Sequence, residues 1–207
     1  MLNYVVAKST AILRRWALAH WMLRILRCVR RIFRSLESKR KILRYIDSQE
    51  ICKLQIGSGG NYIDGWLNTD YSLMDHRMVF LDASKPFPIP DNTFDYVFSE
   101  HQLEQLSYRY GLKMLSECYR ILKPGGKIRI ATTNVDALLT LYKEDNNGLQ
   151  NTYIKWMIDM CFPDTPVYSP NFVLNNAFYN WNHRFLYDQA TLKLALKTSG
   201  FNAMTIF

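Results

Sequence analysis

The stretch KLQIGSGGNYIDGWLNTD, Lys53–Asp70, decides the fold. Leu54 and Ile56 lie in a short apolar strand that runs directly into the glycine-rich turn Gly57–Gly60, and a second strand ends in the carboxylate of Asp70. Glycines after a strand let the backbone come close to a ligand, and an acidic residue ending the next strand can accept hydrogen bonds from a ribose diol. The pattern therefore predicts a nucleoside site where adjacent strands end.

The spacing of these residues narrows the ligand. A dinucleotide fingerprint needs a third glycine, a full helix and an acidic residue about 20 positions on. Tyr62 stands where the third glycine would be, and Asp70 follows Gly57 by only thirteen residues. A pyrophosphate seated on a helix N-terminus is therefore disfavoured, and with it a nicotinamide oxidoreductase. An adenosine without phosphates fits better.

Four segments resemble, in the same order, class I S-adenosylmethionine-dependent methyltransferases of the small type associated with saccharide biosynthesis. They are LQIGSGG (54–60), GWLNTD (65–70), LDASKPFPIPDNTFDYVFSEHQLEQL (81–106) and ECYRILKPGGKIRIAT (117–132). The resemblance implies a Rossmann-like, doubly wound α/β sheet with strand order 3-2-1-4-5-7-6. Gln55 and Gln105 depart from it, because many members have an acidic residue and a histidine at these two places.

The resemblance also implies a cofactor, S-adenosyl-L-methionine, and the residues that bind it, but no metal. The turn and Asp70 would hold the methionine part and the ribose, Asp82 and Ala83 would contact the adenine ring, and backbone after the next strand would lie near the methionine. The implied cofactor-binding residues are Gly57, Ser58, Gly59, Asp70, Asp82, Ala83, Ser99 and Glu100. Asp82 has a second interpretation, as the cap of the turn that follows it.

Three residues are candidates to accept a proton from a substrate hydroxyl: His101, Glu104 and His183. His101 and Glu104 are three positions apart on a predicted first helical turn and share a face, although a solvated helix start is the alternative. His183 belongs to an aromatic and polar set with Tyr168, Trp181, Arg184 and Tyr187. This set lies in residues 134–188, which we expect to form either part of the substrate wall or a small satellite core.

The chain divides into a leader, residues 1–48, and an α/β domain, residues 49–207. Local patterns predict a short helix at Ile42–Ser48 after a hinge at Ser38–Lys41, a helix at Gly111–Leu122 and a helix at Gln189–Gly200. They also predict that Pro124-Gly125-Gly126 stops a helix before the strand Lys127–Thr132, and that Phe201–Phe207 starts a strand. We expect the last strand of the family sheet to be missing.

Positive charge is concentrated in the leader. Residues 1–44 hold twelve Lys and Arg with Glu37 as their one acidic residue, whereas residues 45–207 have a net charge of −3. Residues 11–36 place apolar side chains and arginines at helical spacing, which predicts a basic amphipathic helix. Such a helix suits peripheral contact with an anionic membrane; docking on the domain or a partner, and an organelle transit peptide, are the alternatives. The acidic body disfavours nucleic-acid binding.

Four scattered cysteines without a C-x-x-C pair predict reduced thiols, and with them a cytoplasmic protein, peripheral to the inner face of a membrane if the leader binds one. The sequence thus predicts an S-adenosylmethionine-dependent methyltransferase acting on a small-molecule or saccharide acceptor, at oxygen. A non-catalytic, methyltransferase-like scaffold, recruited by its leader helix, is the alternative. The oligomeric state is not predicted.

Overall fold

The computed structural model describes residues 21–22, 36–142, 148–165 and 167–206. Nearly all of the predicted leader helix, residues 11–36, lies outside these ranges. Within them, no helix combines the length and the apolar character needed to cross a bilayer. In the same ranges, no three His, Cys, Asp or Glu side chains gather in a way that could hold a metal ion.

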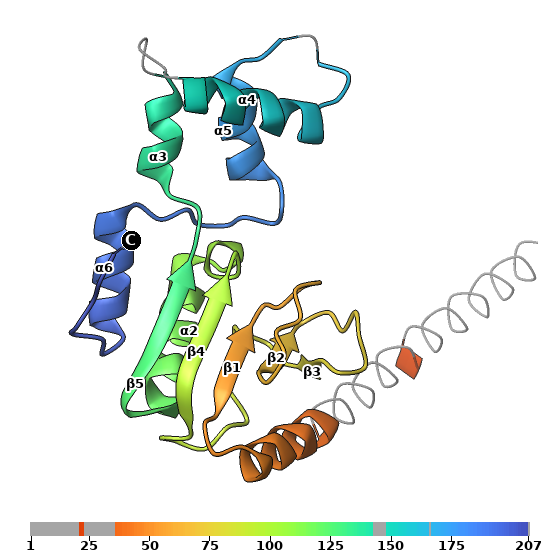
Figure 1. Ribbon diagram of the computed structural model, residues 1–207, viewed down its shortest axis with the longest axis vertical. Helices are drawn as coiled ribbons and strands as arrows, with labels where there is room; N and C mark the ends of the chain where they lie inside the picture. Colours follow the sequence, from red (N-terminus) through yellow and green to blue (C-terminus); the bar gives the residue numbers. More distant parts are fainter. Residues whose placement is uncertain (1–20, 23–35, 143–147, 166, 207) are drawn as a thin grey trace, which may run out of the picture.

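Five parallel strands form the sheet of the described chain, in the order β3-β2-β1-β4-β5 (Figure 1). The strands are β1 Lys53–Ile56, β2 Leu67–Asp70, β3 Val79–Phe80, β4 Phe94–Glu100 and β5 Leu122–Ala131. The chain winds outward from β1 in one direction to β3 and then in the other to β5. This order confirms the predicted Rossmann-like α/β fold and places a topological switch point, where ligands bind in such sheets, between β1 and β4.

Alternate strand residues bury one face of the sheet against helices. Leu54 lies opposite Leu67 of β2 and Val97 of β4, and all three are buried. Helix α2, Tyr108–Ile121, covers this face, and α6, Gln189–Thr198, packs beside α2 (Figure 1). The buried residues of these helices belong to the same core: Gly111, Met114, Leu115, Cys118, Ile121 and Ala195.

Residues 134–188 contain a second, smaller core. Its helices are α3 Val135–Leu139, α4 Gly148–Cys161 and α5 Pro170–Tyr179, together with the short 3-10 helix η2, Thr140–Tyr142. A second 3-10 helix, η1 Leu103–Gln105, belongs to the main body of the protein. Their buried residues are Leu138, Leu141, Ile154, Met157, Ile158, Val173 and Ala177. Figure 1 shows these helices beyond the carboxyl ends of β4 and β5, the edge of the sheet where the glycine turn also lies.

Three local predictions are wrong. Residues 36–48 form one helix without a hinge at Ser38–Lys41, because Ser38 and Ile42 are both buried along it. Residues 201–206 form no strand; the Phe201 N–H donates to the Leu196 carbonyl and its ring packs edge-on against Tyr119, so the chain closes the end of α6 instead.

The third wrong prediction concerns the proline-glycine turn after α2. Helix α2 ends at Ile121, and Pro124-Gly125-Gly126 lies inside β5, where the pairing with β4 shifts register between Phe94 and Tyr96. A bulge tolerates proline because it needs no ladder hydrogen bond at that point. A Cβ on Gly126 would stand 2.9 Å from the Lys123 carbonyl oxygen, so the irregular strand needs glycine there.

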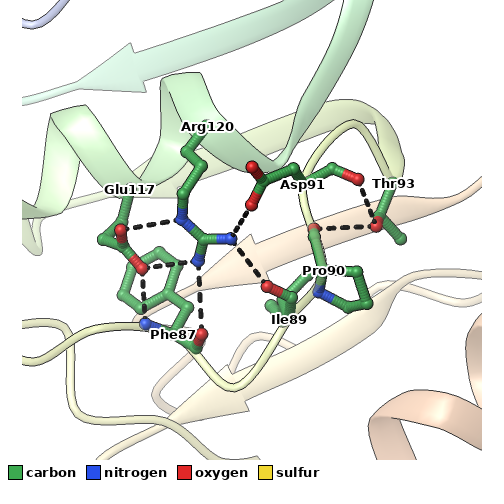
Figure 2. Close-up of polar contacts among 7 residues, drawn as sticks. All are labelled: Phe87, Ile89, Pro90, Asp91, Thr93, Glu117 and Arg120. Atoms are coloured by element: carbon green, nitrogen blue, oxygen red, sulfur yellow. Dashed lines mark hydrogen bonds and ion pairs between the residues drawn. The ribbon is translucent and has the colours of Figure 1, made fainter.

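Arg120 fastens the proline-rich segment before β4 to helix α2 (Figure 2). Its guanidinium donates to the carbonyl oxygens of Phe87 and Ile89, at 3.2 and 2.8 Å, and to the carboxylates of Asp91 and Glu117, each at 2.6 Å. The hydrogen bond from Arg120 lowers the pKa of the Glu117 carboxyl below its ordinary value. The extended segment between Ala83 and β4 is thus tied to α2, the helix that covers the sheet.

We expect Arg120→Ala to lower the free energy of unfolding by about 2 kcal/mol, because two backbone carbonyls and the Glu117 carboxylate lose their donor. Urea denaturation at pH 7 measures this. Because the pKa of Glu117 is lowered in the folded protein, its ionised carboxylate stabilises the fold above the ordinary glutamate pKa. This stabilisation is lost as the pH falls through the folded pKa. The difference in the free energy of unfolding between wild type and Arg120→Ala should therefore become smaller in acid.

Arg109→Ala is the matched control for this substitution, since Arg109 is an exposed residue of the same helix. We expect it to change the free energy of unfolding by less than about 0.5 kcal/mol. Equal effects of the two substitutions would show that the contacts of Arg120 do not stabilise the fold.

Candidate functional site

The glycine turn is built from two residues in the left-handed region. Gly57 has φ +72° and Gly59 has φ +51°, conformations that other residues rarely adopt. The N–H groups of Gly57 and Ser58 both donate to the Thr69 carbonyl, at 2.9 and 3.0 Å, so that the turn is held on the end of β2. The predicted bend therefore lies at the carboxyl end of β1, as the sequence indicates.

The two glycines face different surroundings. A Cβ on Gly57 would stand 2.5 Å from Oε1 of Gln102, so the loop after β4 packs directly on this residue. A Cβ on Gly59 would meet nothing within 4 Å. The turn is therefore closed against β4 on one side and open on the other, as a cradle for a ligand requires.

Asp70 joins the end of β2 to this turn. Its Oδ2 accepts a hydrogen bond from the Gly59 N–H at 2.9 Å, and its Oδ1 accepts one from the Ser72 N–H at 2.7 Å. Each carboxylate oxygen has two lone pairs, so each can accept one more hydrogen bond. The structure thus brings together the turn and the carboxylate that the sequence singles out, with capacity left for a pair of hydroxyl groups.

Asp82 lies beside the same edge but serves first as a turn cap. Strand β3 ends at Phe80, two residues before Asp82, and the Leu81 N–H donates to the Asp70 carbonyl at 3.0 Å. The Oδ1 of Asp82 accepts hydrogen bonds from the N–H and Oγ of Ser84, at 3.0 and 2.6 Å. These contacts agree with the second interpretation of Asp82, as the cap of the turn that follows it. Asp82 also borders a cavity of about 150 Å³, lined further by Ser38, Phe80, Leu81, Lys85, Pro86 and Pro88.

Three buried polar atoms near the turn have no hydrogen-bond partner among the described residues: Gln55 Oε1, Ser58 Oγ and Ser99 Oγ. Ser58 belongs to the turn, and Ser99 lies opposite Ile56 in the pairing of β1 with β4. A buried hydroxyl without a partner is costly, and a bound polar ligand would relieve that cost. These atoms, with the open space at Gly59, fit a ligand that carries hydrogen-bonding groups.

His101 and Glu104 form a hydrogen-bonded pair next to the turn. His101 Nδ1 lies 2.8 Å from Glu104 Oε1; the imidazole side chain is 65% exposed and the Glu104 side chain is completely buried. Thr132 Oγ1 donates to the other oxygen of Glu104 at 2.8 Å, and the N–H and Oγ1 of Thr133 approach Oε1 at 3.3 Å. Glu104 is therefore not placed to take a proton from a substrate, in contrast to the sequence prediction.

The net effect of these surroundings is to lower the pKa of the Glu104 carboxyl. Burial acts to raise the pKa, but the hydrogen bonds from His101, from the backbone and from Thr132 outweigh it. The residues that hold Glu104 ionised, Thr132 and Thr133, were missed by sequence reasoning. No local signal points to them, because they lie 28 and 29 positions further along the chain.

The predicted aromatic set of residues 134–188 does not gather at one place. Tyr187 is buried in the main core, where burial raises its pKa to about 12. Tyr168 donates to Asp159 on α4, at 2.9 Å. His183 lies in the loop after α5, and its Nδ1 is 2.6 Å from the Ala177 carbonyl oxygen, so Nδ1 carries the proton. Of this set, Arg184 alone reaches the His101–Glu104 pair, by donating its N–H to the Glu104 carbonyl at 2.7 Å.

Comparison with known sequences gives one family match and two curated relatives. Residues 54–130 match the family described as a methyltransferase domain, which is less than half of the chain. Demethylmenaquinone methyltransferases from two strains of Staphylococcus epidermidis are each 28% identical to the chain over 138 residues. The alignment covers 65% of this chain and 51% of each relative, so the chain spans about half the length of the curated relatives it matches.

Solved structures with a similar arrangement include two methyltransferases. An S-adenosylmethionine-dependent methyltransferase from Archaeoglobus fulgidus has 21% sequence identity and a TM-score of 0.47, covering 82% of this chain and 69% of that one. A putative methyltransferase from Bacillus halodurans has 14% identity and a TM-score of 0.43, covering 79% and 65%. Residues 54–130, which hold the glycine turn, Asp70 and most of the parallel β3-β2-β1-β4-β5 sheet, are thus similar in sequence to a methyltransferase domain.

Proposed function

We propose that this chain is an S-adenosylmethionine-dependent methyltransferase that acts at a hydroxyl oxygen of a small or glycan-linked acceptor. The observation that carries the proposal is the hydrogen bond from the Gly59 N–H to Asp70, which joins the open glycine turn and a carboxylate beside the switch point of the sheet. The family match over residues 54–130 supports an enzyme rather than a non-catalytic scaffold.

The residues around the turn fit S-adenosylmethionine. Asp70 would accept hydrogen bonds from the ribose diol, and Asp82 and the Ala83 N–H would contact the adenine ring. The methionine part would lie along the turn, near the unpaired hydroxyls of Ser58 and Ser99. The backbone at Glu100, the last residue of β4, would lie beside it. When bound, the cofactor supplies a methyl group on a positively charged sulfur, which a nucleophile can attack.

The chain itself would contribute mainly by positioning. Charge disappears from the sulfur as the methyl group leaves, so the protein has little new charge to stabilise. Holding the nucleophile in line with the methyl group can contribute roughly 7–11 kcal/mol at best. The helices α3–α5 lie beyond the strand ends that carry the turn, which is where an acceptor would have to be held (Figure 1).

Calorimetric titration with S-adenosylhomocysteine tests the proposal without knowledge of the acceptor. We expect saturable binding with a dissociation constant in the micromolar range, and no heat at millimolar ligand would end the proposal. Methyl transfer would then be measured with labelled S-adenosylmethionine and three classes of acceptor: saccharides, phenols, and demethylmenaquinone, the compound named for the staphylococcal relatives. Transfer to a ring carbon of demethylmenaquinone alone would contradict the assignment to oxygen.

A further inference from the structure

We propose that His101 and Glu104 act as a dyad, in which Glu104 orients the imidazole and His101 Nε2 removes the proton from the acceptor hydroxyl during methyl transfer. This proposal rests on the function proposed above. It names the general base of the site and requires an acceptor that carries an ionisable O–H group. His101 is the catalytic residue of the pair, and Glu104 is a positioning residue.

The first argument is the state of the carboxylate. Glu104 is fully buried; its two oxygens accept hydrogen bonds from Thr132 and Thr133 at 2.8–3.3 Å, and Oε1 lies 2.8 Å from His101 Nδ1. A buried carboxylate with this many donors stays ionised and accepts hydrogen bonds only. It therefore requires Nδ1 of His101 to carry a proton, which leaves Nε2 of the neutral imidazole with a free lone pair.

The second argument is the exposure of the His101 side chain. The His101 side chain is 65% exposed although its partner is completely buried, so the ring is anchored at Nδ1 and open to solvent elsewhere. The backbone of His101 has φ +51° and its N–H donates to the Ala131 carbonyl at 3.0 Å. A non-glycine residue rarely adopts the left-handed region, and such backbone strain concentrates at functional sites.

The third argument is location. His101 follows directly after β4, whose Ser99 pairs with Ile56, the residue before the glycine turn. The next residue, Gln102, packs against Gly57 itself. The exposed imidazole thus belongs to the loop that closes one side of the turn where the cofactor would lie.

The chemical step balances within the proposed reaction. The acceptor oxygen forms a bond to the methyl carbon, the bond from that carbon to sulfur breaks, and its electron pair stays on the sulfur as a neutral thioether. The hydroxyl proton moves to His101 Nε2, and the resulting imidazolium is stabilised by the Glu104 carboxylate. The proton then leaves to solvent from the exposed ring.

Nuclear magnetic resonance of ¹⁵N-histidine protein tests the anchoring without any cofactor. For the neutral imidazole, we expect the nitrogen shifts of His101 to show a proton on Nδ1 and none on Nε2, with the signal assigned by its loss in His101→Gln. Glu104→Gln should remove this preference, whereas Glu104→Asp should partly retain it. A proton on Nε2 in the wild-type protein overturns the proposal.

Turnover on two probe acceptors separates a base from a structural histidine. With phenol, His101→Gln should lower kcat by about 10²–10⁴-fold with little change in KM. With 4-nitrophenol at pH 8, which is already ionised, the loss should be less than tenfold. Equal losses on the two probes would show that His101 supports the structure and does not remove the proton.

His76→Gln is the matched control, because His76 is 92% exposed beside a carboxylate, Asp75, at 3.4 Å, but lies outside the site. We expect no change in turnover from it. Failure of the proposed function and failure of the dyad give different results. Absence of S-adenosylhomocysteine binding contradicts the proposed function, whereas an imidazole protonated on Nε2 contradicts the dyad alone.

Discussion

Asp70→Asn is expected to weaken binding of S-adenosylhomocysteine by about 10- to 150-fold, or about 1.5–3 kcal/mol, the contribution of a charge-assisted hydrogen bond. The asparagine oxygen can still accept the Gly59 N–H and so keep the bond to the turn, whereas the Ser72 N–H loses its acceptor. The amide nitrogen cannot accept a ribose hydroxyl, and the negative charge is lost. Calorimetric titration of wild type and variant under the same buffer conditions measures the ratio of dissociation constants.

Asp64→Asn is the control for that titration, since Asp64 is an exposed carboxylate in the connection between β1 and β2. It removes the same charge from the same region without touching the turn. We expect its dissociation constant to stay within twofold of wild type. If the two variants bind equally well, Asp70 does not contact the ribose.

Glu104→Gln is expected to lower the free energy of unfolding by about 3 kcal/mol, the largest effect on stability that we predict for a polar residue of the site. The carboxylate is fully buried and every group around it donates a hydrogen bond. The glutamine NH₂ is itself a donor, so at least one of these groups loses its acceptor. Urea denaturation at pH 7 measures the difference.

The effect of Glu104→Gln should depend on pH with a definite sign. Because the pKa of Glu104 is lowered in the folded protein, the ionised carboxylate adds stability above the ordinary glutamate pKa and loses it as pH falls through the folded pKa. Wild type should therefore lose stability in acid faster than Glu104→Gln. Glu100→Gln is the control, because Glu100 is an exposed glutamate in the same region. If the stability of both variants depended on pH in the same way, the pH dependence could not be assigned to Glu104.

Local patterns were sufficient to predict the strands around β1 and the position of the glycine turn beside Asp70. Each strand near β1 is an apolar run with a clear end, and the glycines and Asp70 occupy those ends. Their hydrogen-bond partners are close in the sequence: Gly59 and Asp70 are eleven positions apart. The strand order was implied by the resemblance to class I S-adenosylmethionine-dependent methyltransferases, because local patterns do not determine which strands pair.

The remaining features depend on contacts between distant segments, which local patterns do not contain. The burial of Glu104 requires residues 132–133 and 184–185, and a glutamate at a helix start usually faces water. Helix α4 was missed because apolar side chains occupy both of its faces: Ile154 and Ile158 are buried, whereas Leu149 and Trp156 are exposed. Tyr187 was grouped with the aromatic set of residues 134–188, expected in either a substrate wall or a satellite core, but it lies in the main core. The sequence shows the aromatic composition of that segment and not the tertiary contacts of its members.

The position of Glu104 has a consequence for the order in which the parts of the candidate site form during synthesis. Its side chain is anchored by residues 132–133 and its backbone carbonyl by the N–H groups of Arg184 and Phe185, which are made about 80 residues later. The glycine turn can close on Asp70 as soon as the first strands have left the ribosome. A nascent chain is therefore expected to acquire its nucleoside cradle early and its oriented imidazole only near the end of translation.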